Sequence, residues 1–115
     1  MKYALLLMGH ANDPACGEHG GASPEEFFAF DREITEAGVV VSSFALEDPE
    51  QGVSVGSDER GERVVSSGPF AEVQEFVGGG YIIDVANIDE AIAWARKSPA
   101  SAPGGHVEIR PLAPY

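Results

Sequence analysis

The sequence has one cysteine and few cations: seven lysines and arginines stand against 19 aspartates and glutamates in 115 residues. A single cysteine cannot form an internal disulfide, which excludes a small disulfide-stabilised secreted scaffold. With a net charge of −12, the chain lacks the clustered cations that nucleic acids and anionic membrane surfaces require. We therefore expect neither nucleic acid nor membrane among its partners.

Long apolar runs are also missing. The first run, from Tyr3 to Met8, stops at Gly9-His10, so it is too short for a membrane span or for a signal peptide. We interpret it as a buried strand, and because no export signal precedes it we expect a cytoplasmic protein.

None of the common phosphate-binding or nucleophile motifs is present in the sequence: the P-loop, Gly-x-Gly-x-x-Gly after a strand, and Gly-x-Ser-x-Gly are all missing. Gly78-Gly79-Gly80 comes before an expected strand instead of opening a helix, so we interpret it as a connection and not as a phosphate cradle. No cofactor is predicted.

What the sequence does contain is a single domain, residues 1–115, with alternating apolar and polar segments. These patterns predict strands at 3–8, 39–46, 81–85 and 106–110, a hairpin joining 53–55 to 62–66, and helices after Ser23 and Asn87. The order β-α-β-(hairpin)-β-α-β predicts an α+β ferredoxin-like sandwich with both helices on one face of an antiparallel sheet.

Both helices begin with capping signals. Ser23, Pro24 and Glu26 form a capping box with proline at the first helical position, and Asn87 to Glu90 repeats the pattern. Apolar residues at spacings of three and four predict one buried stripe on each helix, formed by Phe27, Phe30, Ile34 and Ala37 on the first and by Ile88, Ala91, Ile92 and Ala95 on the second.

Two helices cover only one face of a sheet, yet the strands at 3–8, 39–46 and 81–85 carry apolar residues in both registers. We therefore expect a homodimer in which the open sheet faces pack together. The alternative is that long loops fold across that face.

Three segments, Ser67-Gly68-Pro69-Phe70-Ala71-Glu72, Gly79-Gly80-Tyr81-Ile82-Ile83-Asp84-Val85 and Asp89-Glu90-Ala91, together resemble the DGPF-type branch of the YCII-related family. The opening residues 2–6 and the ending residues 104–112 are similar to it as well. The resemblance implies a ferredoxin-like fold of the dimeric α/β-barrel type. It also implies a His/Asp pair in a cleft of the enzyme-like relatives, and a loose association with extracytoplasmic-function sigma factors.

The chain departs from that pattern at two positions. Ser67 stands where the family's turn has an aspartate, and the first helix carries Asp31 as its nearest polar candidate where enzyme-like relatives often have a histidine. Asp31 and His10 are the candidate catalytic residues, with Asp31 as general base; the alternative for Asp31 is a solvated surface carboxylate.

The candidate ligand-binding residues lie on the turn and on two strands. They are Ser67, Gly68, Pro69, Phe70, Glu72, Tyr81 and Arg110. The alternatives are that the rigid turn is structural, that Tyr81 is a packing residue, and that Arg110 forms an ion pair on the face that it shares with His106 and Glu108.

A long polar loop is predicted from Gly9 to Ala22, where His10, Asp13, Cys16 and His19 lie within ten residues. The Cys-x-x-His spacing can bind a metal, but no second ligand pair exists elsewhere, so we predict a polar loop without a metal. The sequence favours a small dimeric enzyme or ligand-binding protein that performs acid–base chemistry on a small organic molecule. The alternative is a non-catalytic interaction module linked to transcriptional regulation.

Overall fold

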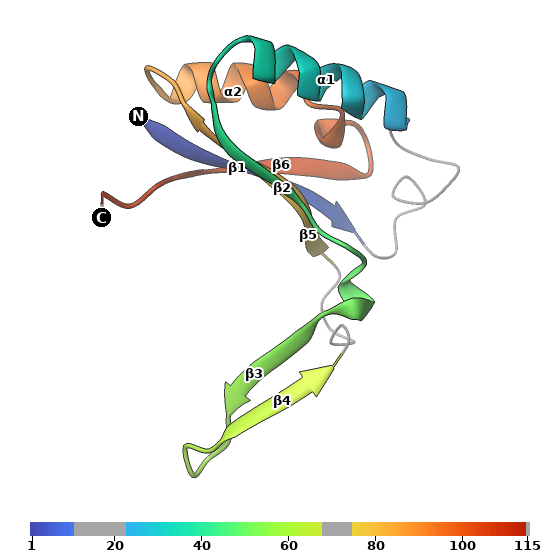
Figure 1. Ribbon diagram of the computed structural model, residues 1–115, viewed down its shortest axis with the longest axis vertical. Coiled ribbons are helices and arrows are strands. Elements are labelled where there is room, and N and C mark those ends of the chain that lie inside the picture. Colours follow the sequence, from blue (N-terminus) through green and yellow to red (C-terminus); the bar gives the residue numbers. More distant parts are fainter. Residues whose placement is uncertain (11–22, 68–74, 115) are drawn as a thin grey trace.

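The computed structural model of the chain describes residues 1–10, 23–67 and 75–114 (Figure 1). Its elements are β1 (Lys2–His10), α1 (Pro24–Glu36), β2 (Val40–Ala45), β3 (Val53–Ser57), β4 (Arg63–Ser67), β5 (Glu75–Asp84), α2 (Ile88–Lys97) and β6 (Gly105–Pro111), with short 3-10 turns η2 (Pro49–Gln51) and η3 (Pro99–Ser101). Within these residues neither helix is long and apolar enough to cross a membrane.

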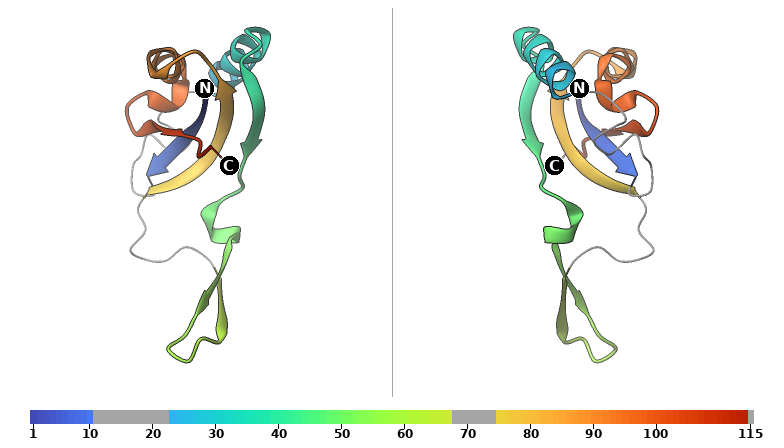
Figure 2. Two further views of the ribbon diagram at one scale, coloured as in Figure 1. Left: turned by 90° about the vertical axis from the view of Figure 1, so that its left-hand side faces the viewer. Right: turned by 90° about the vertical axis from the view of Figure 1, so that its right-hand side faces the viewer.

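Four strands form an antiparallel sheet in the order β2-β5-β1-β6, and β3 and β4 form a separate two-stranded sheet. Both helices lie on one face of the larger sheet (Figures 1 and 2). The predicted α+β ferredoxin-like fold and its additional hairpin are therefore confirmed.

The core lies between the helices and the sheet. Tyr3 and Leu5 of β1 point toward the helices, and their cross-strand partners Ile83 and Tyr81 of β5 point the same way. Ile34 of α1 packs against them and is fully buried, as are Leu5 and Ile83. Because side chains alternate along a strand, the residues between them must face the opposite side of the sheet.

That opposite face, here called the open face, is covered by no element of the described chain (Figure 2). Its centre is apolar, with half-buried Leu6 and Ile82 and the exposed Phe44. Its edge strand β6 alternates as predicted, so that Glu108 and Arg110 lie on the open face while Val107 and Ile109 face the core. The apolar second register expected from the sequence is thus present on three of the four strands.

Local sequence signals set the ends of helix α1. The Ser23 hydroxyl accepts a hydrogen bond from the Glu26 N–H at 3.3 Å, and the Ser23 N–H donates to the Glu26 carboxylate at 3.0 Å. The capping box is therefore complete. Gly38 follows the helix with φ +77°, a conformation that glycine adopts without strain.

The Ser23 cap leads to a stability prediction. Substitution S23A removes the acceptor for the Glu26 N–H and should lower the free energy of unfolding by about 1 kcal/mol. Urea denaturation followed by circular dichroism measures the loss. The control S54A removes a serine hydroxyl from an exposed strand position and should change stability by less than about 0.5 kcal/mol. Equal losses in the two variants would show that the cap contributes nothing.

The predicted buried stripes are only partly correct. Phe30 and Ile34 are buried in α1, and Ala91 and Ala95 in α2, but Phe27 is 37% exposed and Ile88 41% exposed. Phe27 and Ile88 lie in the first turn of their helix, and Ile92 of α2 is half-buried. Phe27 instead lines a cavity at the end of the sheet. Ala37 is also exposed, because it is the C-cap residue.

The interpretation of Gly78-Gly79-Gly80 as a connection is wrong, since all three glycines lie inside β5. Two of them sit where β2 and β5 approach closely. A Cβ atom on Gly79 would lie 2.7 Å from the carbonyl oxygen of Phe44, and one on Gly80 would lie 2.8 Å from the Phe44 ring. The glycines therefore let β2 pair with β5 where a side chain would collide.

Candidate functional site

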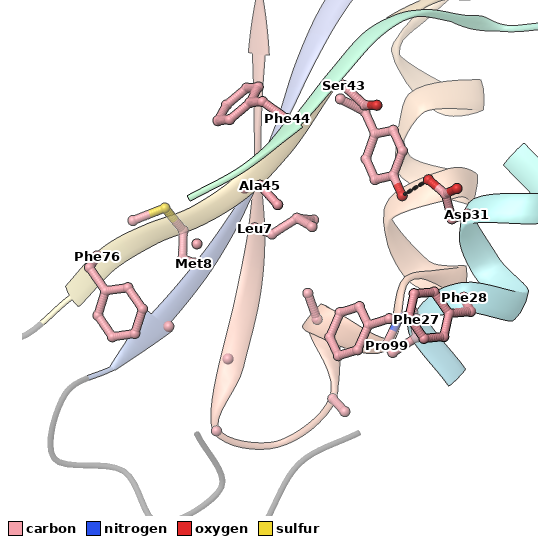
Figure 3. A pocket seen from close by; sticks show the side chains of 18 of the residues that line it. Leu7, Met8, Phe27, Phe28, Asp31, Ser43, Phe44, Ala45, Phe76 and Pro99 are labelled. Atoms are coloured by element: carbon pink, nitrogen blue, oxygen red, sulfur yellow. Dashed lines mark hydrogen bonds between the residues drawn. The ribbon is translucent and has the colours of Figure 1, made fainter. Parts of the chain in front are cut away.

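A cavity of about 740 Å³ opens where the first turns of α1 overhang the ends of β1 and β2 (Figure 3). Its size is within the usual range for sites that hold small molecules. The walls come from β1, α1, β2, β5 and the segment around η3. Aromatic and aliphatic side chains and glycines dominate the lining, which consists of Leu7, Met8, Gly9, Phe27, Phe28, Asp31, Ser43, Phe44, Ala45, Phe76, Gly78, Gly79, Tyr81, Pro99, Ala100, Ala102, Pro103, Gly104 and Gly105.

One polar pair stands in this apolar lining. The Tyr81 hydroxyl donates a hydrogen bond to Asp31 Oδ1 at 2.8 Å, across a separation of 50 residues in the sequence (Figure 3). Tyr81 comes from β5 and is 8% exposed, while Asp31 comes from α1 and remains exposed to the cavity. The contact holds one carboxylate oxygen and leaves Oδ2 as an acceptor for a molecule in the cavity.

The Tyr81 ring is held in place by packing. Phe30, the next residue before Asp31, meets the Tyr81 ring edge-on with centroids 5.8 Å apart, and it meets Trp94 of α2 in the same way at 6.3 Å. Such edge-to-face pairs have a preferred geometry. Phe30 therefore holds the Tyr81 ring directly and is itself held by α2 through Trp94, which fixes the position of the Tyr81 hydroxyl beside Asp31.

Burial, with the hydrogen bond to Asp31 and its negative charge as smaller causes, raises the pKa of Tyr81 well above its ordinary value of 10.0. Desolvation penalises the phenolate, and a neighbouring carboxylate penalises it again. Tyr81 is accordingly a neutral hydrogen-bond donor at physiological pH and not a base.

This shift predicts how stability depends on pH. The native state keeps the Tyr81 proton at a pH where the unfolded chain has lost it, so Tyr81 stabilises the fold fully below about pH 10 and the contribution is lost as pH rises further. The slope attributable to Tyr81 approaches about 1.4 kcal/mol per pH unit. Urea denaturation of the native protein and of the Y81F variant between pH 8 and 11 measures the free energy of unfolding at each pH. That free energy should fall more steeply with pH in the native protein than in Y81F. Parallel curves would contradict the assignment.

The charge that the described residues bring to the cavity is negative only. Among the described residues that line it, Asp31 is the sole ionisable group besides the neutral Tyr81, and neither lysine nor arginine contributes. The whole chain carries a net charge of −12. A molecule that enters the cavity therefore meets negative potential, and an anion is disfavoured.

The structure brings together two of the residues singled out from the sequence, Asp31 and Tyr81. It places two others elsewhere. Arg110 is on the open face of the sheet, opposite Ala4 of β1, and Ser67 ends β4 in the hairpin; neither lines the cavity. His10 is the last residue of β1 and pairs with Glu75, so the strand extends two residues beyond its predicted end at Met8, and the predicted start of the loop at Gly9 is wrong.

The remaining candidates lie outside the described residues. These are Gly68, Pro69, Phe70 and Glu72 of the turn, together with Asp13, Cys16 and His19 of the loop. In the part of the chain that the structure describes, no three His, Cys, Asp or Glu side chains are grouped as metal ligands would be.

The aromatic wall of the cavity was missed in the sequence. Phe28 and Phe76 line it, and the Phe76 ring lies over Gly9, where a Cβ atom would be 2.7 Å from Phe76 Cζ. One signal was available: Phe28 falls off the apolar stripe of α1 and is 68% exposed. Phe28 stands next to Phe27, which is 37% exposed, and two adjacent exposed aromatic residues form an apolar patch of the kind that marks binding surfaces.

Comparison with known proteins gives two matches. The sequence profile of the YCII-related domain matches residues 1–115. An uncharacterized protein of Rhizobium meliloti (strain 1021) is 50% identical over 56 residues, which are 48% of this chain and 45% of the relative. The match thus covers less than half the length of that curated relative.

Proposed function

The chain belongs to the YCII-related family, and from this premise we propose that the cavity of Asp31 and Tyr81 binds a small organic molecule and removes a proton from it. The observation that carries the proposal is the 2.8 Å hydrogen bond that fixes a carboxylate in a largely apolar cavity. General bases in enzymes are positioned groups of this kind.

In this proposal Asp31 accepts the proton. Its carboxylate is exposed to the cavity, and Oδ2 faces no other described side chain within hydrogen-bond distance. Tyr81 acts as a positioning residue, because its hydroxyl holds Oδ1 and stays protonated throughout. The proton moves from the bound molecule to Asp31. It can return to a different carbon of that molecule, which balances an isomerisation, or it can protonate a leaving group whose bond to the molecule breaks, which balances an elimination.

The lining indicates the substrate class. Phe27, Phe28 and Phe76, together with Leu7 and Met8, favour a largely apolar or aromatic body, and the single carboxylate favours one hydroxyl or amino group. The absence of lysine and arginine from the described lining disfavours carboxylates and phosphates. The proposed substrate is therefore an uncharged or cationic molecule with one hydrogen-bond donor.

Three probes of equal size and different charge test this: benzylamine, benzyl alcohol and benzoate. Benzylamine and benzyl alcohol should stabilise the protein in thermal unfolding, by about 1.4 kcal/mol at ten times the dissociation constant. Benzoate should not. Benzoate binding as tightly as benzylamine would refute the proposal.

A variant pair identifies the group that binds the amine. Substitution D31N should weaken benzylamine about tenfold, because it removes a charge-assisted hydrogen bond worth about 1.5 kcal/mol. The control E36Q removes the same charge from an exposed position on the same helix and should change the affinity less than twofold. Unchanged affinity in D31N would exclude Asp31 from the site.

We also propose that the protein is a homodimer in which the open face is covered by a second copy. Leu6, Ile82 and Phe44 form an apolar centre there, flanked by Glu108 and Arg110 on β6. Two copies related by a twofold axis can pair opposite charges at such a face. Size-exclusion chromatography with light scattering should give about twice the chain mass of 12.1 kDa; a 12.1 kDa species at micromolar concentration would refute the dimer.

A further inference from the structure

The β3–β4 hairpin projects from the end of the sheet, away from both helices (Figures 1 and 2). We call residues 53–67 the arm. Its two strands pair with each other and with no strand of the larger sheet. An isolated two-stranded hairpin is marginally stable in water, so an arm of this kind needs a surface to pack against.

The register gives the arm one apolar face. Val55 is paired with Val65, so these two valines lie on the same side, and Val53 lies two residues along the same strand. All three are 64–67% exposed in the single chain. Ser54, paired with Ser66, points to the other side. Three exposed valines on one face of a projecting hairpin indicate a contact surface.

The dimensions of the chain show how much surface is left uncovered. Its accessible area is 8052 Å², whereas a compact monomer of its mass exposes about 6,000 Å². Its radius of gyration is 16.0 Å, against about 13 Å for a compact domain of this length. The excess of about 2,000 Å² is more than one partner contributes to a standard protein–protein interface, which is about 800 Å².

Charge indicates which partner fits. The arm holds three acidic and two basic residues, a net charge of −1, while the whole chain carries −12. The face of the arm that carries the valines has no acidic side chain, so a second acidic copy can approach that face without like-charge repulsion. Arg63 stands at the tip end of the valine face, opposite Ser57, where it can meet the acidic body of another copy.

We infer that the arm is a dimerisation arm: its Val53–Val55–Val65 face packs on a second copy of this chain and extends the interface of the open sheet face. The inference rests on the homodimer proposed above. Each copy provides one arm and receives one, as twofold symmetry requires. The arm is then stabilised by the partner and not by its own chain.

Sedimentation velocity across a concentration series tests the arm with a matched pair of variants. Substitution V55D places a charge on the valine face, and S54D places the same charge on the opposite face one residue away. Val55 is 64% exposed in the single chain, so V55D leaves the fold of one copy intact, which circular dichroism checks. We expect V55D to raise the dimer dissociation constant at least tenfold and S54D to change it less than threefold.

The outcomes separate the two proposals. A native protein that is monomeric at 100 µM would overturn both the dimer and the arm. A native dimer that V55D and S54D weaken equally, or that neither weakens, would overturn the arm alone and leave the sheet-face dimer standing.

Discussion

Replacing Ile34 with alanine should lower the free energy of unfolding by about 2–5 kcal/mol. Ile34 is fully buried in α1 and packs with Leu5 and Ile83, the two other largest fully buried side chains. The substitution removes three methyl or methylene groups and leaves a cavity between the helix and the sheet. Because a domain of this size is stable by only about 5–15 kcal/mol, the loss is a large fraction of the total stability.

Urea denaturation of I34A, followed by tryptophan fluorescence, measures this loss. The matched control is I88A, which removes the same groups from a residue that is 41% exposed at the start of α2. It should cost no more than about half as much, because much of that side chain is already in water. A larger loss in I88A than in I34A would mean that the core does not lie between α1 and the sheet.

Replacing Gly79 with alanine should cost about 1–3 kcal/mol, the usual penalty for inserting an atom into a tightly packed region. The new Cβ atom would lie 2.7 Å from the Phe44 carbonyl oxygen and 3.3 Å from Ala45 Cα, both backbone atoms that cannot rotate away. Strand β2 must therefore move away from β5. That strand supplies Ser43, Phe44 and Ala45 to the cavity wall, so ligand binding should weaken as well.

Gly56 provides the control for Gly79. It also lies in a strand, and nothing is within 4 Å of the position of its Cβ atom. G56A should leave stability unchanged or raise it slightly, because it reduces the freedom of the unfolded chain. Urea denaturation and benzylamine titration of both variants give the comparison. Equal stability of G79A and G56A would contradict the close approach of β2 and β5.

Much of this fold could be predicted because its signals are local. Ser23 and Glu26 start α1, Gly38 follows its end, and the alternation from His106 to Arg110 marks β6. The same signals give the element order, and the order limits the fold to few arrangements. The hairpin was equally visible, because two short β-branched segments flank a polar turn.

The errors arise where distant segments meet. The three glycines of β5 resemble a connection until β2 is placed beside them, and only the close contact with Phe44 explains them. Asp31 and Tyr81 are 50 residues apart, so no sequence spacing indicates their hydrogen bond. Phe76 joins the cavity because Gly9, on the neighbouring strand, leaves room for its ring.

The sequence also does not indicate that the valines of the arm are exposed. Alternating valines predict strands whether or not a surface covers them, and the pattern at Val53, Val55 and Val65 is that of a half-buried hairpin. The structure shows these valines uncovered in the single chain. A half-buried pattern and exposed valines are both explained if the surface that covers the valines belongs to another copy of the chain.

The proposal that the cavity binds the ligand is tested most directly by nuclear magnetic resonance of the two methionines. Met8 lines the cavity and Met1 does not. Protein labelled with ¹³C at the methionine methyl groups gives one resonance for each. On titration with benzylamine the Met8 resonance should shift and saturate while Met1 stays in place, and D31N should require about ten times more ligand for the same shift. A Met8 resonance that does not move while benzylamine stabilises the protein would place the ligand elsewhere and contradict the proposed site.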